Sequence, residues 1–156
     1  MKGNKKILEF LNEVLTGELT SVNQYFIHAK MCENWGYRKL KKVLWDESIG
    51  EMKHADRIIE RILFLEGIPN VTAYDKISVG SGVQQQLEND LGLELAALTV
   101  LRPGIKTCLE ASDDASRELL EDIVVDEEKH VDWIETQLHQ IDEVGYQNYL
   151  AQQIDE

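Results

Sequence analysis

Apolar side chains recur at steps of three and four residues along four long segments of this chain. This spacing places them on one face of a helix, so each segment predicts an amphipathic helix. The predicted helices cover residues 4–34, a second segment after Gly36 that ends at Gly67, residues 87–108, and a fourth segment after Asp113 that ends at Gly145. Residues 146–154 are expected to add a short fifth helix. The sequence therefore predicts an all-α fold.

The connections between the predicted helices differ in length. Residues 67–82 include three glycines and Pro69, and these sixteen residues are more than a tight turn needs. We expect them to form one long crossover, with short connections elsewhere. Pro103 lies inside the third helix, but the apolar stripe continues in register to Cys108, which favours a kink over a stop. The prediction is a single domain, residues 1–156, built as a four-helix bundle with one crossover.

Composition narrows the class of protein. The chain has 156 residues, 43% of them hydrophobic, and its 16 Lys and Arg against 29 Asp and Glu give a net charge of -13. Such a charge repels nucleic acids and anionic membranes, so neither partner is expected. Glu9 and Glu13 interrupt any signal peptide, and the apolar stretch 91–101 is too short to span a membrane. Cys32 and Cys108 form no CxxC pair, which fits a reducing compartment, and a cytoplasmic location is expected.

Four carboxylates interrupt the apolar stripes at positions that face the bundle axis. Charged side chains rarely enter a core without a partner, so these residues are the informative ones. They are Glu18, Glu51, Glu94 and Glu127. Two of them begin a Glu-x-x-His motif, which ends at His54 in one case and at His130 in the other. A spacing of three residues places the carboxylate and the imidazole on the same helix face.

The spacing of these residues repeats within the chain. Glu18 and Glu51 are 33 residues apart, as are Glu94 and Glu127, and the two sets are offset by 76 residues. A two-helix unit used twice would bring two Glu and two Glu-x-x-His to one level, the ligand set of di-iron and di-manganese carboxylate bundles. Oxygen-rich ligands with two imidazoles suit iron or manganese better than zinc or copper. Four carboxylates also balance the charge of two dications.

Some residues permit more than one interpretation. A single Glu-x-x-His motif occurs by chance on many surface helices, whereas two copies at one offset favour the metal site. Tyr25 lies seven residues after Glu18 on the same face and either bonds to a site carboxylate or merely packs. His28 and His139 have no comparable partners and are expected at the surface or at an interface. Cys32 and Cys108 are expected to be small core or interface residues.

Several strings are more specific than the bundle pattern: MKG at the start, NQYF at 23–26, EMKHAD at 51–56, ERILFLEG at 60–67, DEE at 126–128, DW at 132–133 and QNYL at 147–150. In these strings the chain resembles the bacterioferritins over nearly its whole length. The resemblance implies a ferritin-like bundle in which twenty-four subunits close into a hollow shell that stores ferric mineral. It also implies that six residues form a di-iron ferroxidase centre, namely Glu18, Glu51, His54, Glu94, Glu127 and His130.

Met52 matches the residue that ligates haem b in that family, one from each of two subunits across a two-fold interface. On a helix it lies about 100° around from Glu51, so it should face away from the carboxylates. There a thioether would pack an interface or act as a soft axial ligand. The resemblance makes haem the expected ligand. An apolar interfacial pocket for it could be lined by Leu19, Asn23, Phe26, Trp45 and Ile49.

Two sets of positions concern how iron moves through the protein. Some bacterioferritins carry a His and an Asp at the positions of Asp46 and Gly50, where they form an iron site on the inner surface, and this chain departs from that pattern. Other positions match residues that line a pore in some relatives, namely Asn34, Glu66, Asp132 and Thr136. Acidic residues in such a pore would draw Fe2+ inward.

Together these features predict an iron-storage protein with ferroxidase activity, which oxidises Fe2+ with O2 or H2O2 and receives electrons for iron release from a ferredoxin-type reductant. One alternative is a haem-containing electron-transfer or storage shell whose metal pair is only structural. Another is a peroxide-reducing or substrate-oxidising di-metal protein, including manganese catalases. A small oligomer would favour the substrate-oxidising alternative over a shell.

Overall fold

The computed structural model describes residues 1–155, which form five helices and no β-strand. The helices are α1 (Lys5–Trp35), α2 (Arg38–Phe64), α3 (Val83–Glu110), α4 (Asp114–Val144) and α5 (Tyr146–Ala151). The all-α prediction is confirmed. The expected end of α2 at Gly67 is three residues too late, because Glu66 has a φ of 61° and already turns the chain out of the helix.

The helix ends follow from local side-chain chemistry. The Asn4 side chain accepts hydrogen bonds from the backbone N–H groups of Lys6 (2.8 Å) and Ile7, two of the four that α1 cannot pair internally. Gly36 ends α1 with a φ of 84°, a conformation that glycine adopts without strain. At the start of α4, the side chain of Asp113 accepts a hydrogen bond from the Ser116 N–H at 3.1 Å.

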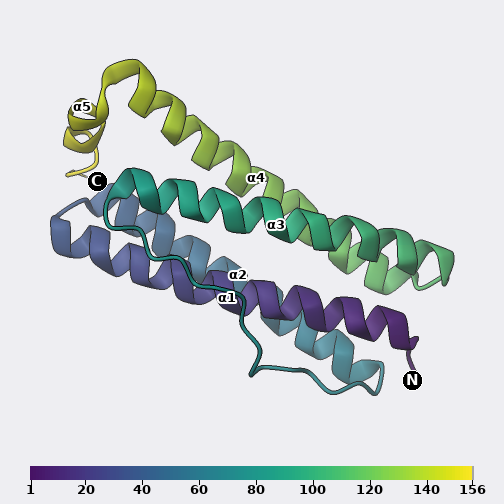
Figure 1. Ribbon diagram of the computed structural model, residues 1–156. Coiled ribbons are helices and arrows are strands. Elements are labelled where there is room, and N and C mark those ends of the chain that lie inside the picture. Colours follow the sequence, from purple (N-terminus) through teal and green to yellow (C-terminus); the bar gives the residue numbers. More distant parts are fainter. Residues whose placement is uncertain (156) are drawn as a thin grey trace.

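The four long helices form two hairpins, α1 with α2 and α3 with α4 (Figure 1). Helix α3 runs in the same direction as α2, so the chain must return along the bundle before α3 begins. Residues 65–82, here called the strap, make this return along α1, and the predicted four-helix bundle with one long crossover and a short C-terminal helix is confirmed (Figure 1). None of the helices in residues 1–155 has the length and apolar character of a membrane span.

Two apolar clusters fill the bundle, one toward each end. The first includes Leu11, Leu15, Ile58, Leu98 and Leu120, and the second includes Tyr25, Leu44, Leu87, Ile134 and Tyr149. Along each long helix the chain passes from one cluster to the other. Between them comes one of the four predicted carboxylates. A polar layer therefore lies between two apolar ones, and helices anchored at both ends hold its side chains in place.

The Pro103 and Gly104 pair lies within α3, which continues to Glu110. The prediction that proline does not stop the helix is confirmed, and the kink stays a prediction. Close packing explains why a glycine occupies position 104. A Cβ added at Gly104 would lie 3.2 Å from Leu120 on α4 and 3.5 Å from Phe10 on α1, which is close to the limit of contact. Gly104 thus permits α3 to approach both neighbours closely.

A row of polar side chains on α1 holds the strap in place. The row follows a four-residue spacing, which aligns side chains along one face of a helix. Each side chain accepts a hydrogen bond from a strap backbone N–H: Asn12 from Asn70 (2.8 Å), Thr20 from Asp75 (2.9 Å), Gln24 from Ser78 (2.9 Å) and His28 from Gly80 (3.0 Å). A strap without secondary structure thereby satisfies backbone groups that would otherwise be costly to bury.

His28 is fully buried beneath the strap, so its expected place at the surface or an interface was wrong. Because the Gly80 N–H can only donate, Nε2 of His28 accepts, and the ring proton lies on Nδ1. Nδ1 donates to Asp90 Oδ1 at 2.9 Å, and Gln24 donates to the same oxygen at 2.8 Å. This network joins α1, α3 and the strap. His139 is exposed, as expected.

We expect His28→Leu to destabilise the protein, because leucine leaves the buried Gly80 N–H without its acceptor and leaves the Asp90 carboxylate with the Gln24 amide as its remaining partner. Each orphaned buried group costs about 1–3 kcal/mol. Denaturant unfolding followed by circular dichroism measures the change in the free energy of unfolding. His139→Leu makes the same substitution at an exposed position and should change it little. Equal stability of the two variants would contradict the role assigned to His28.

Candidate metal centre

One glutamate from each long helix lies in the polar layer between the two apolar clusters. Glu18 comes from α1, Glu51 from α2, Glu94 from α3 and Glu127 from α4, and none is more than 2% exposed. The four side chains interrupt apolar stripes, so the packing that buries those stripes also carries the carboxylates inside. The prediction that all four face the bundle axis is confirmed.

Both predicted histidines point Nδ1 at these carboxylates. Nδ1 of His54 lies 3.4 Å from Glu18 and 3.5 Å from Glu127, and Nδ1 of His130 lies 3.0 Å from Glu51 and 3.5 Å from Glu94. The Glu-x-x-His spacing therefore does bring each imidazole to the level of the carboxylates. All six residues selected from the sequence meet in one place.

The six residues form two overlapping groups, each able to hold one metal ion. Within each group the donor atoms lie within 4.8 Å of one another, and the groups are Glu18, Glu51, His54 and Glu127, and Glu51, Glu94, Glu127 and His130. Glu51 and Glu127 belong to both groups. A carboxylate has two oxygens, so each of these residues can offer one oxygen to each ion. The geometry fits a pair of metals bridged by Glu51 and Glu127.

The hydrogen bonding of these atoms supports the same interpretation. Buried polar atoms nearly always have a partner. Within residues 1–155, at least one buried donor or acceptor in each of the six side chains lacks one, including Nδ1 of both histidines. Nδ1 of His130 is only 3.0 Å from Glu51, yet neither that nitrogen nor the facing oxygen, Oε1, has a hydrogen-bond partner. These unpaired nitrogen and oxygen atoms lie together in the two groups, and coordination of a metal ion by each group would satisfy them.

Two further carboxylates hold the outer nitrogens of the histidines. Nε2 of His54 lies 2.8 Å from Asp126, and Nε2 of His130 contacts Glu47. A carboxylate on the far nitrogen keeps the proton there and leaves Nδ1 free for a metal. The spacing of the motifs does not predict this role for either residue. The available signals were that Asp126 precedes Glu127 and that Glu47 lies one turn before Glu51.

Tyr25 is buried beside the centre and donates a hydrogen bond of 2.6 Å from its hydroxyl to Glu94. Of the two interpretations left open by the sequence, the hydrogen bond to a site carboxylate is the correct one. Burial, and then the charge of Glu94, raise the pKa of the Tyr25 phenol well above its ordinary value. The phenol therefore remains protonated and continues to donate to Glu94.

Without metal, the charges of the centre are balanced by protons. Burial and the neighbouring Glu51 raise the pKa of Glu18 well above its ordinary value, and they raise that of Glu94 to about 7. Burial alone would lower the pKa of each histidine, but contacts with carboxylates outweigh it and raise the pKa of His54 to about 11 and that of His130 to about 12. At neutral pH both imidazoles therefore carry a proton that a metal must displace.

We expect metal binding to release protons and to tighten as the pH rises. The direction follows from the raised histidine pKa values, because the protonated forms prevail at neutral pH and a metal binds only the deprotonated nitrogen. Affinity should increase about tenfold per pH unit for each proton displaced. Calorimetric titration with Co2+ in buffers of different ionisation enthalpy counts these protons. Binding without proton release would show that His54 and His130 are not ligands.

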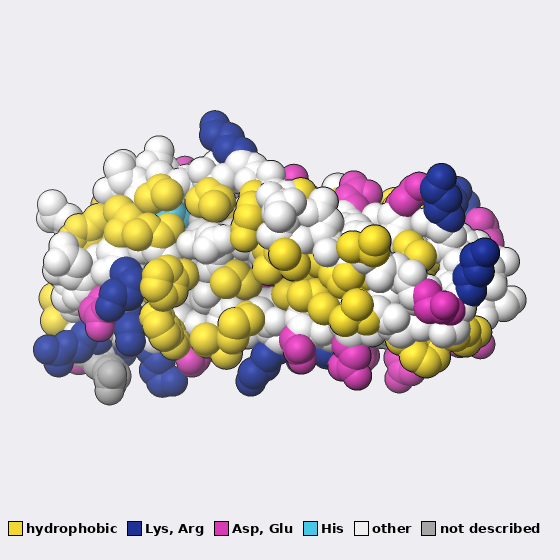
Figure 2. Space-filling view, turned by 90° about the horizontal axis from the view of Figure 1, so that it is seen from below, with side chains coloured by type: hydrophobic (Ala, Val, Ile, Leu, Met, Phe, Trp, Pro, Cys, Tyr) yellow, Lys and Arg dark blue, Asp and Glu magenta, His cyan; other side chains and the backbone are white. Residues whose placement is uncertain are grey.

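Met52 lies on the outer side of α2, as predicted, and is 49% exposed. Phe26 on α1 and Trp45 on α2 belong to the same hairpin, and their ring centroids lie 5.5 Å apart. Figure 2 shows that hydrophobic side chains form a broad band on the side of the molecule that carries α1, α2 and the strap. A surface of this kind is typical of an interface.

The remaining predicted positions are distributed as follows. Cys32 and Cys108 are buried and unpaired, as expected. The four positions that match a pore, Asn34, Glu66, Asp132 and Thr136, are all exposed. Asn34 is near the end of α1, whereas Glu66 follows α2 at the opposite end of the hairpin, so these two do not meet within one chain. A pore built from them requires several copies.

Asp46 and Gly50 are the two positions on α2 at which the sequence departs from the pattern of an accessory iron site. Asp46 instead forms an exposed ion pair with Lys42 at 3.3 Å. At Gly50 an added Cβ would meet nothing within 4 Å, so the helix leaves open space at that position.

Comparison with known proteins agrees with this architecture. The chain matches the model of the ferritin family, described as a ferritin-like domain, over residues 8–144. It is 46% identical to a bacterioferritin of Mycobacterium bovis over 152 residues, which are 97% of this chain and 96% of the relative. It is 45% identical to a bacterioferritin of Rhodobacter capsulatus over 149 residues, 96% of this chain and 92% of the relative. The match to a bacterioferritin of Streptomyces coelicolor is 42% over 156 residues, 100% of this chain and 93% of the relative. With this coverage, and with all six candidate ligands brought together in the bundle, the chain belongs to the bacterioferritin family.

Proposed function

We propose that this protein is a ferroxidase that oxidises Fe2+ at the centre formed by Glu18, Glu51, His54, Glu94, Glu127 and His130, and that it stores the ferric product. The observation that carries this proposal is the pair of overlapping ligand groups that share Glu51 and Glu127. Two groups with shared carboxylates place two Fe2+ ions side by side. Substrate ions held in this way can give up one electron each in the same event.

Each residue has a separate task in this reaction. Glu51 and Glu127 hold both ions, Glu18 and His54 complete one position, and Glu94 and His130 complete the other. The oxygen-rich set with two imidazoles suits iron better than zinc or copper. For H2O2 the balance is two Fe2+, one H2O2 and two protons giving two Fe3+ and two H2O, and for O2 the same two electrons give H2O2. Asp126 and Glu47 orient the two imidazoles.

Stopped-flow absorbance tests this function on the metal-free protein mixed with Fe2+ and an oxidant. We expect a fast phase whose amplitude stops growing at two Fe2+ per chain, because there are two ligand groups. Zn2+ added beforehand should occupy the same residues and remove the fast phase. If the metal pair is only structural, zinc is held as well as iron and no fast phase occurs. The absence of a break at two Fe2+ per chain would reject the ferroxidase function.

Storage requires a compartment, and we propose the hollow shell of twenty-four chains that the resemblance implies. Twenty-four copies of a 17.9 kDa chain amount to about 430 kDa. The exposed apolar band on the hairpin of α1 and α2 supports association through that face (Figure 2). Light scattering coupled to gel filtration measures the assembly. A dimer or another small oligomer would overturn storage in a shell and favour a substrate-oxidising di-metal protein.

We also propose that Met52 ligates haem b. The residues present fit this group, because an exposed thioether lies on the same hairpin as Phe26 and Trp45, which supply apolar surface. Two-fold symmetry brings Met52 of one copy opposite Met52 of the other, so one haem serves two chains. When bound, the haem would supply electron transfer. A ferredoxin-type reductant is the proposed electron donor for iron release.

We expect Met52→Leu to lose haem while Fe2+ oxidation continues, because Met52 is absent from both ligand groups and lies on the outer face of α2. The Soret band of protein purified with added haem measures occupancy. Met31→Leu is the matched control, since the sulfur of Met31 is already engaged by the Gln86 amide. A normal Soret band in Met52→Leu would show that the axial ligand lies elsewhere.

A further inference from the structure

The carboxylates of Glu18 and Glu94 have different surroundings, although the two residues hold matching places in the repeated sequence. The hydroxyl of Tyr25 donates a hydrogen bond of 2.6 Å to Oε1 of Glu94, and this tyrosine is buried. Oε2 of Glu94 is buried as well and has no hydrogen-bond partner within residues 1–155. The phenol thus holds Glu94 in one orientation while an oxygen of the carboxylate remains free for a metal ion.

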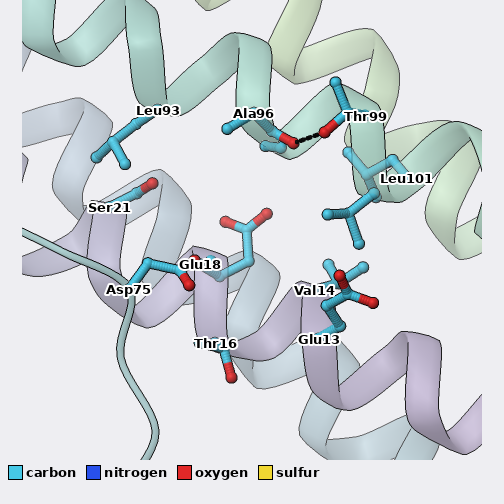
Figure 3. A pocket seen from close by; sticks show the side chains of 13 residues that line it. Glu13, Val14, Thr16, Glu18, Ser21, Asp75, Leu93, Ala96, Thr99 and Leu101 are labelled. Carbon is cyan, nitrogen blue, oxygen red and sulfur yellow. Dashed lines mark hydrogen bonds between the residues drawn. The ribbon is translucent and has the colours of Figure 1, made fainter.

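A leucine takes the place of this phenol beside Glu18. The offset of 76 residues that relates Glu18 to Glu94 also relates Tyr25 to Leu101. Leu101 and Glu18 both line a pocket between α1 and α3, whose volume is about 340 Å³ (Figure 3). A leucine side chain has no hydrogen-bond donor. The repeat therefore places a hydrogen bond at one carboxylate and open space at the other.

In the structure of residues 1–155, no donor replaces the phenol at the buried oxygen of Glu18, Oε2. Figure 3 shows the Glu18 carboxylate pointing into the pocket. The Thr99 hydroxyl, which also lines this pocket, donates to the Ala96 carbonyl at 2.6 Å. Glu18 therefore loses side-chain freedom when it binds a metal ion, whereas Glu94 is already ordered by Tyr25.

The other ligands of the two metal positions do not differ in this way. Glu51 and Glu127 belong to both ligand groups. Each imidazole has a carboxylate at Nε2, which is Asp126 in one case and Glu47 in the other. A difference in affinity between the positions therefore originates mainly from the two glutamates that are not shared.

We infer that the two metal positions are inequivalent, and that the position completed by Glu94 binds a divalent cation more tightly than the position completed by Glu18. Tyr25 is the positioning residue for Glu94, and Leu101 leaves Glu18 without the same support. Loss of a hydrogen bond that orients a ligand typically costs about 10–100-fold in metal affinity, so we expect a difference of about tenfold or more. The inference rests on the proposed function, because it assumes that the six residues hold two substrate ions.

Equilibrium binding of Co2+ to metal-free protein, without oxidant, measures each position alone. His54→Ala leaves the Glu94 position complete, and His130→Ala leaves the Glu18 position complete. The visible absorbance of bound Co2+ gives a dissociation constant for each variant. We expect this constant to be about tenfold or more lower in His54→Ala than in His130→Ala. Equal constants, or tighter binding by His130→Ala, would overturn the inequivalence.

The variant Tyr25→Phe removes the hydroxyl and keeps the ring. Combined with His54→Ala, it should weaken Co2+ binding about tenfold, because only the Glu94 position is complete there. Combined with His130→Ala, it should change Co2+ binding little, because Glu18 receives no hydrogen bond from this phenol. A merely structural role of Tyr25 would weaken both positions alike, and that result would overturn its assignment as the positioning residue.

Tyr149→Phe is the matched control for Tyr25→Phe. Tyr149 is also buried, and its hydroxyl donates to Gln137 at 2.7 Å, not to a residue of either ligand group. Removing this hydroxyl should leave the dissociation constants of both single-position variants unchanged. Weakening of the Glu94 position by Tyr149→Phe to the same degree as by Tyr25→Phe would show that the effect is not specific to the hydrogen bond on Glu94.

The variant Leu101→Tyr supplies a donor on the Glu18 side, where the pocket has room for a larger ring. In the His130→Ala background we expect it to bind Co2+ severalfold more tightly than Leu101→Phe, which adds the ring without the hydroxyl. Equal binding by these two variants, both shown to be folded by circular dichroism, would overturn the part assigned to Leu101.

Failure of this inference is distinguishable from failure of the proposed function. A parent protein that binds no Co2+ would show that the metal centre itself is wrong. A parent that binds two Co2+ per chain, with equal constants in His54→Ala and His130→Ala, would leave the centre in place and overturn only the inequivalence.

Discussion

Replacing Glu51 by alanine is expected to slow Fe2+ oxidation strongly, and a comparable effect is expected only at Glu127, which also belongs to both ligand groups. Glu51 belongs to both ligand groups, so its loss weakens both metal positions and removes a bridge between them. Loss of a residue that merely orients a ligand typically costs 10–100-fold, so we expect a reduction of about 100-fold or more here. Stopped-flow absorbance at two Fe2+ per chain measures the initial rate.

Two further variants serve as comparisons for Glu51→Ala. Glu47→Gln changes a residue that contacts the outer nitrogen of His130, and its effect should fall between those of Glu51→Ala and the parent. Glu60→Gln removes an exposed carboxylate and should oxidise iron like the parent. Circular dichroism establishes that Glu51→Ala is folded. A folded Glu51→Ala protein that oxidises Fe2+ at the parental rate would refute the assignment of the bridge.

Saturation of the metal-free protein with Co2+ is expected to raise its resistance to unfolding strongly. A ligand that binds only the folded state stabilises it by about 2.7 kcal/mol at one hundred times its dissociation constant, and here there are two such positions. The stabilisation is large because bound metals satisfy buried carboxylate and imidazole atoms that otherwise have no hydrogen-bond partner. The thermal midpoint, measured with and without Co2+, reports the effect.

A variant that lacks a ligand of one metal position tests this stabilisation. His130→Ala removes a ligand of one group and leaves the other intact, so Co2+ should raise its thermal midpoint by a smaller amount. His139→Ala changes an exposed histidine of the same helix and should respond like the parent. If Co2+ leaves the parental midpoint where it was, the six residues do not hold metals in the folded state.

The metal centre could be predicted from sequence because its residues violate a strong local pattern. Glu18 and Glu94 occur where an apolar residue belongs, and a carboxylate is tolerated inside a bundle only if something balances its charge. The two Glu-x-x-His motifs and the 76-residue offset then predict that all six side chains lie at one level of the bundle. The helix pattern and the length of the strap were sufficient to predict the topology of the bundle.

The residues around the centre were less predictable for a physical reason. The acceptor role of His28 depends on the strap, because the Gly80 N–H that donates to it lies more than fifty residues further along the chain. Glu47 acts through His130 on another helix, so its role depends on the relative rotation of α2 and α4. Contacts of this kind are set by how helices and loops dock, which no local pattern encodes.

The expectations that concern several copies of the chain stay predictions. Haem at Met52, a pore from Asn34 and its companions, and the shell all depend on surfaces that meet only in an assembly. A single chain shows where such surfaces lie, as the apolar band on α1, α2 and the strap does (Figure 2). The identity of the reductant likewise depends on a second protein.

The row of acceptors on α1 has a consequence for local stability. The acceptors at Thr20, Gln24 and His28 line up only while α1 is helical, because the four-residue spacing aligns side chains in no other conformation. The strap has no ladder of its own, so the backbone amides of Asp75, Ser78 and Gly80 should exchange their hydrogens only when this part of the bundle opens. A segment that is irregular in shape thus forms one cooperative unit with α1, and its protection against exchange reports on that helix.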